Sequence, residues 1–367
     1  MKFKINQSIL NKGLSTVQKA ITSRSTIREL EGVLITLENN TLKLTGTDAE
    51  IISIETSLEC NGETDGKTLV NARLFGDIIR KLPDDVIRME KVGDKLKIKC
   101  KNSDFELLVY DYMEFPSISD YEVDNFVKIK DKDLKQAIKQ TSFAVSLDYN
   151  RRSLTGVNFE VKDGEIKFAA LDGYRLSVLK RDATSKEECS VIVPGRSLGI
   201  LNSILNDDDE EVLIEFSRNN IRFKIGKTYF YSQLVDGQFF NYRDILRDDS
   251  EHATIVKVNR SEFQRSLERA ELLAKEEKAN LVKLEFKDDT LNIQSNSEFG
   301  KVQELVQIET EGPNQKIAFN SRYLLDGIKN MDDEEIKIEL LDDVNPMIIV
   351  GIDNPDYLYL VLPVRLA

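Results

Sequence analysis

The segment from Val33 to Asp48, VLITLENNTLKLTGTD, occurs three times in related form in this chain. Its counterparts are VNFEVKDGEIKFAALD, which starts at Val157, and VKLEFKDDTLNIQSNS, which starts at Val282. In each copy, apolar residues alternate up to a polar turn and alternate again after it, which predicts a β-hairpin with one buried face. The alternating residues are Ile35, Leu37, Leu42 and Leu44, then Phe159, Val161, Ile166 and Phe168, and finally Leu284, Phe286, Leu291 and Ile293.

Two helices are predicted around each hairpin. One follows about forty residues later, in NARLFGDIIRKLPDD, GRSLGILNSILNDDDEE and NSRYLLDGIKNMDDEE, and ends each time in an acidic turn. The other precedes the hairpin and carries apolar residues at helical spacing: Leu10, Leu14, Val17 and Ile21; Leu134, Ile138 and Ala144; Phe263, Leu267 and Ala270. Each repeat is therefore predicted to run helix, hairpin, strands, helix, strands, as an α+β domain with a sheet on one side and two helices on the other.

Polar connectors suggest where the repeats meet. DYEVDNF and RDDSEHA lie near residues 125 and 250. We therefore expect three domains, at residues 1–125, 126–250 and 251–367, in agreement with a chain of 367 residues being too long for one ordinary core.

Composition excludes several classes of protein. No apolar run approaches the roughly 18 residues of a membrane span, and the start MKFKINQSIL lacks a signal-peptide layout, so a cytoplasmic protein is expected. Three widely separated cysteines, Cys60, Cys100 and Cys189, favour neither a disulfide framework nor a zinc site.

An enzyme finds little support in the sequence. The single histidine, His252, lies in a connector, and no phosphate-binding loop, GxSxG or HExxH pattern occurs. Asp48 and Asp172 take equivalent repeat positions, but Ser297 replaces them in the third copy, which is typical of turn residues. We therefore expect no catalytic residue, no cofactor and no metal site.

The distribution of charge matters more than its sum. The chain has 51 basic and 64 acidic residues, a net charge of −13, yet residues 7–28 contain four basic residues and no acid. Acidic clusters fall in turns, whereas the helices carry these basic residues: Lys12, Lys19, Arg24, Arg28, Arg73, Arg80, Lys81, Lys132, Lys135, Lys139, Arg196, Arg265, Arg269, Arg322 and Lys329. A relatively basic helical surface suits sequence-independent contact with DNA phosphates. Ordinary solvated helix faces are the alternative, and the third-repeat helix from Arg260 is indeed mixed in charge.

Several motifs resemble those of one known family. They are MKF at Met1, TGTDAE at Thr45, LDGYRLSV at Leu171, VIVPGRSL at Val191, LVDGQFFNYRDIL at Leu234 and YLVLPVRLA at Tyr359. Together they resemble the bacterial DNA sliding clamp, the β subunit of the DNA polymerase III holoenzyme, over the whole chain. The resemblance implies the DNA-clamp (processivity) fold, with sheets outside and helices lining a ring formed by two head-to-tail subunits.

The resemblance also implies a function and partners. The homodimeric ring would encircle duplex DNA without reading its sequence, and would tether the replicative DNA polymerase and other proteins with a clamp-binding motif for processive synthesis. A clamp loader would open it. The alternative is a repeat scaffold that binds partner peptides without encircling DNA.

A size estimate supports the dimer independently. Six lining helices about 10 Å apart make a circle roughly 19 Å across at the helix axes, which leaves about 9 Å after side chains. Twelve helices would leave about 28 Å, enough for a duplex roughly 20 Å wide.

The resemblance assigns roles to individual residues. For DNA these are Arg24 and Arg73 near the duplex and Arg151 and Arg152 in a loop that touches it, with Arg196 as a further basic helix residue. Arg152 and Ser153 occupy positions where aromatic residues can stand in relatives. For the ring contact they are Phe105 and Leu107 on an edge strand, with Leu272 and Leu273; packing inside their own domains is the alternative.

A pocket for partner peptides is implied between the second and third domains. Its matching positions are Leu154, Leu171, Gly173, Tyr174, Arg175, Leu176, Phe240, Ile245, Leu360, Val361, Leu362, Pro363 and Arg365. Burial of two or three apolar anchors at about 1.5–3 kcal/mol each would hold a flexible peptide. Phe240 stands where the family usually has Pro, and Asp244 stands where a basic residue is common. The rim of the pocket and its peptide preference can therefore differ from those of relatives. Without the family, LVLPVRLA predicts a buried edge strand.

Overall fold

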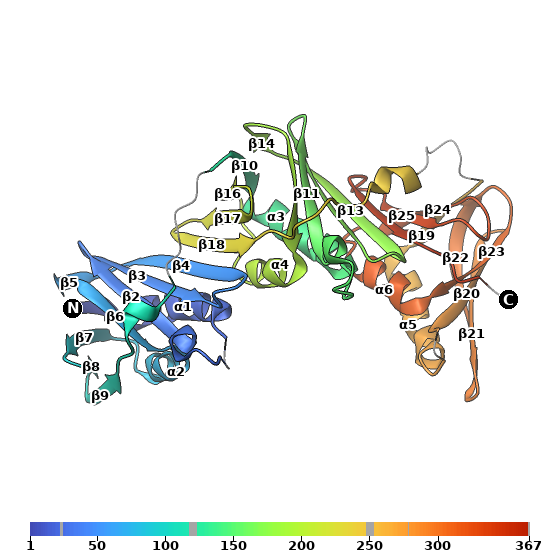
Figure 1. The fold of residues 1–367 in the computed structure, drawn as a ribbon. Coiled ribbons are helices and arrows are strands. Elements are labelled where there is room, and N and C mark those ends of the chain that lie inside the picture. The colour runs from blue at the N-terminus through green and yellow to red at the C-terminus, as the bar shows by residue number, and fades with distance from the viewer. Residues whose placement is uncertain (23–24, 117–122, 247–252, 278, 366–367) are drawn as a thin grey trace. The chain divides into compact units, whose positions relative to one another are not determined.

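The structure is a computed structural model that describes residues 1–22, 25–116, 123–246, 253–277 and 279–365 (Figure 1). The chain forms two compact units. Unit 1 comprises Met1–Lys132, Thr184–Glu187 and Arg196–Leu234, and unit 2 comprises Asp133–Ala183, Glu188–Gly195 and Val235–Ala367. The second repeat thus contributes to both units. The predicted division at residues 125 and 250 stays a prediction, and the second of these positions lies outside the described residues.

All three repeated segments form the predicted hairpins. They are β2 (Gly32–Glu38) with β3 (Thr41–Thr47), β11 (Gly156–Lys162) with β12 (Glu165–Leu171), and β20 (Leu281–Lys287) with β21 (Thr290–Ser297). The alternating apolar residues face one another across each pair, as in Ile35 with Leu44, Phe159 with Phe168 and Leu284 with Ile293. All of these side chains are buried.

The hairpin turns explain why polar residues recur between the strands. Asn39 and Asn40 have φ of 47° and 64°, and Asp163 and Gly164 have φ of 52° and 79°. Two consecutive positive φ values define the two-residue turn whose twist matches that of the flanking strands, and Asn, Asp and Gly tolerate it best. In these two hairpins the turn chemistry therefore fixes the register that places the apolar residues on the buried face.

Unit 1 contains two antiparallel sheets. The larger has the order β14-β10-β16-β17-β18-β4-β3-β2-β6, and the smaller has the order β5-β1-β7-β8-β9. Their further strands are β14 (Thr184–Ser185), β10 (Asn125–Lys130), β16 (Glu211–Phe216), β17 (Asn220–Ile225), β18 (Thr228–Gln233), β4 (Ile52–Glu59), β6 (Gly66–Asn71), β5 (Asn61–Thr64), β1 (Lys2–Asn6), β7 (Val86–Val92), β8 (Lys95–Cys100) and β9 (Ser103–Leu108). Pairing of β18 with β4 makes one sheet continuous across the first and second repeats.

Helices α1 (Gln7–Val17) and α2 (Ala72–Lys81) cover the sheets of unit 1 and pack against each other. Leu10, Leu14 and Val17 are buried as predicted, and the α-helix ends before Ile21. Asn71 caps α2, because its side chain accepts a hydrogen bond from the Leu74 N–H at 2.9 Å. Helix α4 (Gly195–Asn202) lies almost wholly in this unit.

Unit 2 contains one long antiparallel sheet with the order β15-β11-β12-β13-β26-β25-β24-β19-β22-β21-β20-β23. Its further strands are β15 (Cys189–Pro194), β13 (Arg175–Asp182), β26 (Tyr357–Val361), β25 (Met347–Gly351), β24 (Glu335–Leu340), β19 (Thr254–Asn259), β22 (Gly300–Glu311) and β23 (Gln315–Asn320). Its helices are α3 (Asp131–Thr141), which belongs to this unit from Asp133 on, α5 (Arg260–Ala274) and α6 (Ser321–Lys329). Helix α5 packs against α6. Asn259 and Asn320 cap α5 and α6 as Asn71 caps α2.

Two expectations about strands were wrong. Each repeat begins with a strand before its first helix, β1, β10 or β19, which the predicted element order omitted because each strand runs straight into the helix. The closing segment is also not an edge strand, since β26 pairs with β25 on one side and with β13 of the second repeat on the other. The partner strand β13 is distant in sequence, so local pattern could not reveal it.

We expect Leu44→Ala to lower the free energy of unfolding by about 2–5 kcal/mol, because Leu44 is fully buried and its removal leaves a cavity. Leu147→Ala is the matched control, since Leu147 is 88% exposed, and it should change stability by less than about 0.5 kcal/mol. Urea unfolding of both variants at equal protein concentration measures the difference. Equal midpoints would contradict the assigned hairpin core.

Candidate functional site

A cavity of about 280 Å³ opens in unit 2 where β12, β13 and β26 meet the segment around Ile245. It is lined by Arg151, Leu154, Leu171, Gly173, Tyr174, Arg175, Leu176, Phe240, Ile245, Pro346, Leu360 and Leu362. Most predicted pocket positions are therefore brought together here. Val361, Pro363 and Arg365 do not line the cavity, and Val361 is fully buried. Arg151, which was predicted for DNA, and Pro346, which no motif pointed to, do line it.

The apolar floor of the cavity comes from cross-strand pairing. Leu176 of β13 pairs with Leu360 of β26, and both belong to a buried cluster with Leu171 and Tyr242. Leu154 and Ile245 pack against this cluster while leaving surface in the cavity. The Leu362 N–H donates to the Tyr174 carbonyl at 2.8 Å, which extends the strand pairing to the cavity mouth.

A tight turn positions the residues between β12 and β13. The Asp172 carboxylate accepts hydrogen bonds from the N–H groups of Tyr174 and Arg175 at 2.9 and 3.1 Å. Gly173 has a φ of +95°, which residues with a side chain rarely adopt. Asp48 and Ser297 accept backbone N–H groups in the same way, which agrees with the turn role predicted for all three positions.

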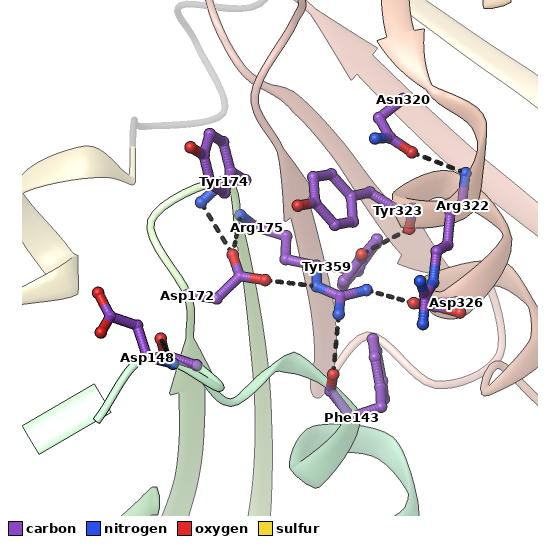
Figure 2. Close-up of polar contacts among 11 residues, drawn as sticks. Phe143, Asp148, Asp172, Tyr174, Arg175, Asn320, Arg322, Tyr323, Asp326 and Tyr359 are labelled. Atoms are coloured by element: carbon purple, nitrogen blue, oxygen red, sulfur yellow. Dashed lines mark hydrogen bonds and ion pairs between the residues drawn. The ribbon is translucent and has the colours of Figure 1, made fainter. Parts of the chain in front are cut away.

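Arg175 is the centre of a buried polar network beside the cavity (Figure 2). Its Nε donates to Asp172 at 3.0 Å, its Nη1 to Asp326 of α6 at 2.6 Å, and its Nη2 to the Phe143 carbonyl at 3.0 Å. Burial alone would lower the pKa of Arg175, but Tyr359 and the two carboxylates outweigh that effect and raise it. The guanidinium therefore stays charged and satisfied by its partners.

Aromatic rings pack around the Arg175 network. The guanidinium of Arg175 lies 4.7 Å from the ring centroid of Tyr323 and 5.5 Å from that of Phe143. Tyr323 stacks on Tyr174 with centroids 5.8 Å apart, and Figure 2 shows the two rings side by side above Arg175. Tyr359 donates its hydroxyl to the Tyr323 carbonyl at 2.6 Å, which ties α6 to β26. Tyr174 itself is 59% exposed.

The residues predicted to contact DNA are distributed over both units. Arg73 is exposed on α2, and Arg196 is exposed on α4 with its guanidinium 3.6 Å from Asp48. Arg151 and Arg152 are exposed at a short 3-10 turn in unit 2. Arg24 and the connector residue His252 lie outside the described residues.

The predicted ring-contact residues lie beside unpaired strand edges. Within the described part of the chain, β9 pairs only with β8. Strand β22 pairs with β21 through residues 300–307 and with β19 only through Ile308–Glu311, so residues 300–307 keep one free edge. Phe105 on β9 is 39% exposed and Leu272 on α5 is 59% exposed, whereas Leu107 is nearly buried and Leu273 is half-buried. Sequence reasoning missed the exposed Leu108 and Leu305. Each lies next to a buried residue, Leu107 or Val306, and is exposed on the opposite face of its strand.

No helix in the described ranges is long and apolar enough to cross a membrane. The same residues include no group of three or more His, Cys, Asp or Glu side chains that could hold a metal ion.

Known proteins share this fold and these repeats throughout. Family models for the DNA polymerase III beta subunit match residues 1–119 with the N-terminal domain, 128–241 with the central domain and 249–365 with the C-terminal domain. The beta sliding clamps of Staphylococcus epidermidis and Staphylococcus aureus are each 34% identical to this chain, over 100% of this chain and 99% of the relative.

Solved structures agree. The DNA polymerase sliding clamp from Bacillus subtilis gives a TM-score of 0.95 at 33% identity, and a sliding clamp from Pseudomonas aeruginosa bound to griselimycin gives 0.95 at 31%, each with 100% of both chains covered. Three α+β repeats of this kind define the class of DNA clamps. The chain belongs to the DNA polymerase III beta subunit family, the bacterial sliding clamps.

Asp326→Ala should destabilise the protein by about 1–3 kcal/mol, because it leaves the buried Arg175 guanidinium without one of its charged partners. Asp332→Ala is the control. It removes the exposed ion pair with Lys139 and should cost less than about 1 kcal/mol. Thermal denaturation compares the two, and similar shifts in midpoint would show that the Arg175 network adds nothing.

Proposed function

We propose that two copies of this chain close into a ring around duplex DNA, and that the cavity of unit 2 binds short hydrophobic segments of its partners. The observation that carries the proposal is the cavity itself. Residues from four distant segments, around Leu154, Leu171, Ile245 and Leu360, converge on one apolar hollow of about 280 Å³ in a chain of the sliding-clamp family. Two apolar anchors would contribute about 3–6 kcal/mol before the cost of ordering the peptide.

Partners and location follow from this role. The replicative DNA polymerase, the clamp loader and other proteins with a clamp-binding motif would share the cavity in turn, in the cytoplasm where the chromosome is replicated. The chain would catalyse nothing itself. It would raise the local concentration of each partner at the DNA by a topological link rather than by tight phosphate binding.

Contact with DNA would come from scattered exposed arginines. Arg73, Arg196 and Arg152 are exposed and lie in loops and helices where basic residues were predicted. Such contacts hold the duplex without base readout, so the ring can slide. A chain with a net charge of −13 repels DNA elsewhere on its surface, which keeps the contact local.

Ring closure would join the free edge of β9 in one subunit to the free edge of β22 in the next. Unpaired backbone groups on both edges would then find partners, and Phe105 and Leu272 would be covered. A head-to-tail contact repeated twice closes a two-subunit ring.

Leu272→Asp should convert the dimer to monomers, because it places a charge in the proposed apolar contact. Val344→Asp is the control, since Val344 is also exposed but lies on the loop between β24 and β25. Sedimentation velocity over a dilution series reports the dissociation constant, which should rise at least tenfold for Leu272→Asp alone. A dimer of unchanged strength would move the contact elsewhere.

Retention on DNA tests the ring directly. The protein is loaded on nicked circular DNA by a clamp loader and ATP, and the circle is then cut with a restriction enzyme. A topological link predicts that the protein stays on circles and leaves linear DNA. Retention on linear DNA would indicate ordinary surface binding, and failure to load with a loader shown active on another clamp would favour the protein-only scaffold.

A further inference from the structure

Arg151 lies in the wall of the cavity, although the family resemblance had implied contact with DNA. Its Nη1 atom is 3.1 Å from the point where a Cβ on residue 173 would stand. The guanidinium thus lies against the turn that carries Tyr174, and a side chain at residue 173 would displace it by a few tenths of an ångström. The neighbouring Arg152 is exposed in the same loop and does not line the cavity.

The backbone that carries Arg151 is fixed. Its N–H donates to the Asp148 carbonyl at 3.0 Å, and its carbonyl accepts from the Leu154 N–H at 2.9 Å. The Leu154 carbonyl in turn accepts from the Ser146 N–H at 2.8 Å, and Leu154 contributes its side chain to the cavity. These bonds hold the backbone of Arg151 beside the apolar floor to which Leu154 contributes.

The two arginines of the cavity differ in what they bind. Arg175 is engaged by Asp172, Asp326 and the Phe143 carbonyl. The guanidinium of Arg151 has no hydrogen bond or ion pair with any residue that the structure describes. An arginine presents five N–H donors in a planar fork that matches a carboxylate, and it is always charged. The cavity therefore offers one uncommitted cation next to an apolar hollow.

We propose that Arg151 recognises a carboxylate of the partner peptide whose apolar side chains fill the cavity. This inference rests on the proposed peptide-binding function of the cavity. The carboxylate can come from an Asp or Glu side chain or from the peptide's own C-terminus. The two neighbouring arginines then bind different ligands. Arg152 contacts DNA, whereas Arg151 discriminates among partner peptides. The contact sets preference more than total affinity, since the apolar anchors supply most of the binding.

The test uses the full-length protein and fluorescence anisotropy. The probes are fluorescein-labelled peptides that share two Leu and one Phe and carry Gln at every other position, with an amidated C-terminus. One series replaces each Gln in turn by Glu, and one further peptide has a free C-terminus. In the wild type at low salt, at least one carboxylate should tighten binding about three- to fivefold over its neutral counterpart.

Matched variants decide whether Arg151 is responsible. Arg151→Gln should abolish the preference for the carboxylate, whereas Arg152→Gln should keep the preference. High salt should reduce the preference in the wild type but not in Arg151→Gln. The proposal is overturned if the wild type binds Glu and Gln peptides equally at every position, or if Arg151→Gln keeps the difference.

Two further measurements separate this inference from the proposed function. Leu362→Asp should weaken every peptide, charged or neutral, because it spoils the apolar cavity. If the wild type binds none of the peptides, both hypotheses are contradicted: peptide binding by the cavity and carboxylate recognition by Arg151. Retention of loaded protein on circular DNA at rising salt is the second measurement, and Arg152→Gln should shorten it more than Arg151→Gln. An effect on DNA from Arg151→Gln without an effect on peptide preference would assign Arg151 to phosphate instead.

Discussion

Pairing of β13 with β26 is the contact on which the candidate site depends. It joins a strand of the second repeat to the last strand of the chain, with Leu176 opposite Leu360 and Arg175 opposite Val361. Because the side chains of adjacent strands stand beside one another on each face, this pairing creates the apolar floor of the cavity. It also brings Tyr174, which lines the cavity, next to Tyr323 of α6. The cavity is therefore lined by residues of two repeats, such as Leu176 and Leu362. Loss of this one ladder would remove the floor and the wall together.

The repeats show how one turn can serve structure in one place and a site in another. Asp48 and Asp172 accept backbone N–H groups through one carboxylate oxygen in the same arrangement. The second carboxylate oxygen has a different partner in each residue. In Asp172 it accepts from Arg175 at 3.0 Å, whereas in Asp48 it lies 3.6 Å from the exposed Arg196. Arg175 also finds Asp326 and two aromatic rings, which have no counterpart around Asp48 among the described contacts. The site thus arises where the repeats diverge.

The arrangement of charge fits a protein that stays on DNA through weak contacts and can slide along it. Acidic residues outnumber basic ones, 64 to 51, but exposed arginines such as Arg73 and Arg196 occur on the helices. Scattered phosphate contacts bind weakly and equally at every position along the duplex. A family whose members act as sliding clamps needs this balance, because tight binding would prevent sliding and purely repulsive charge would prevent positioning.

The sequence by itself determined the hairpins, the two helices of each repeat and the turn residues. The reason is that alternation, helical spacing and turn chemistry are local, as Ile35, Leu44 and Asn39 illustrate. The family resemblance supplied most positions of the cavity. Tertiary structure alone decided that β26 is an interior strand, that Asp326 and Phe143 hold Arg175, and that Arg151 lines the cavity while Arg152 does not. These facts depend on contacts between residues far apart in the chain, and no local pattern of side chains encodes which distant strand or helix will be the neighbour.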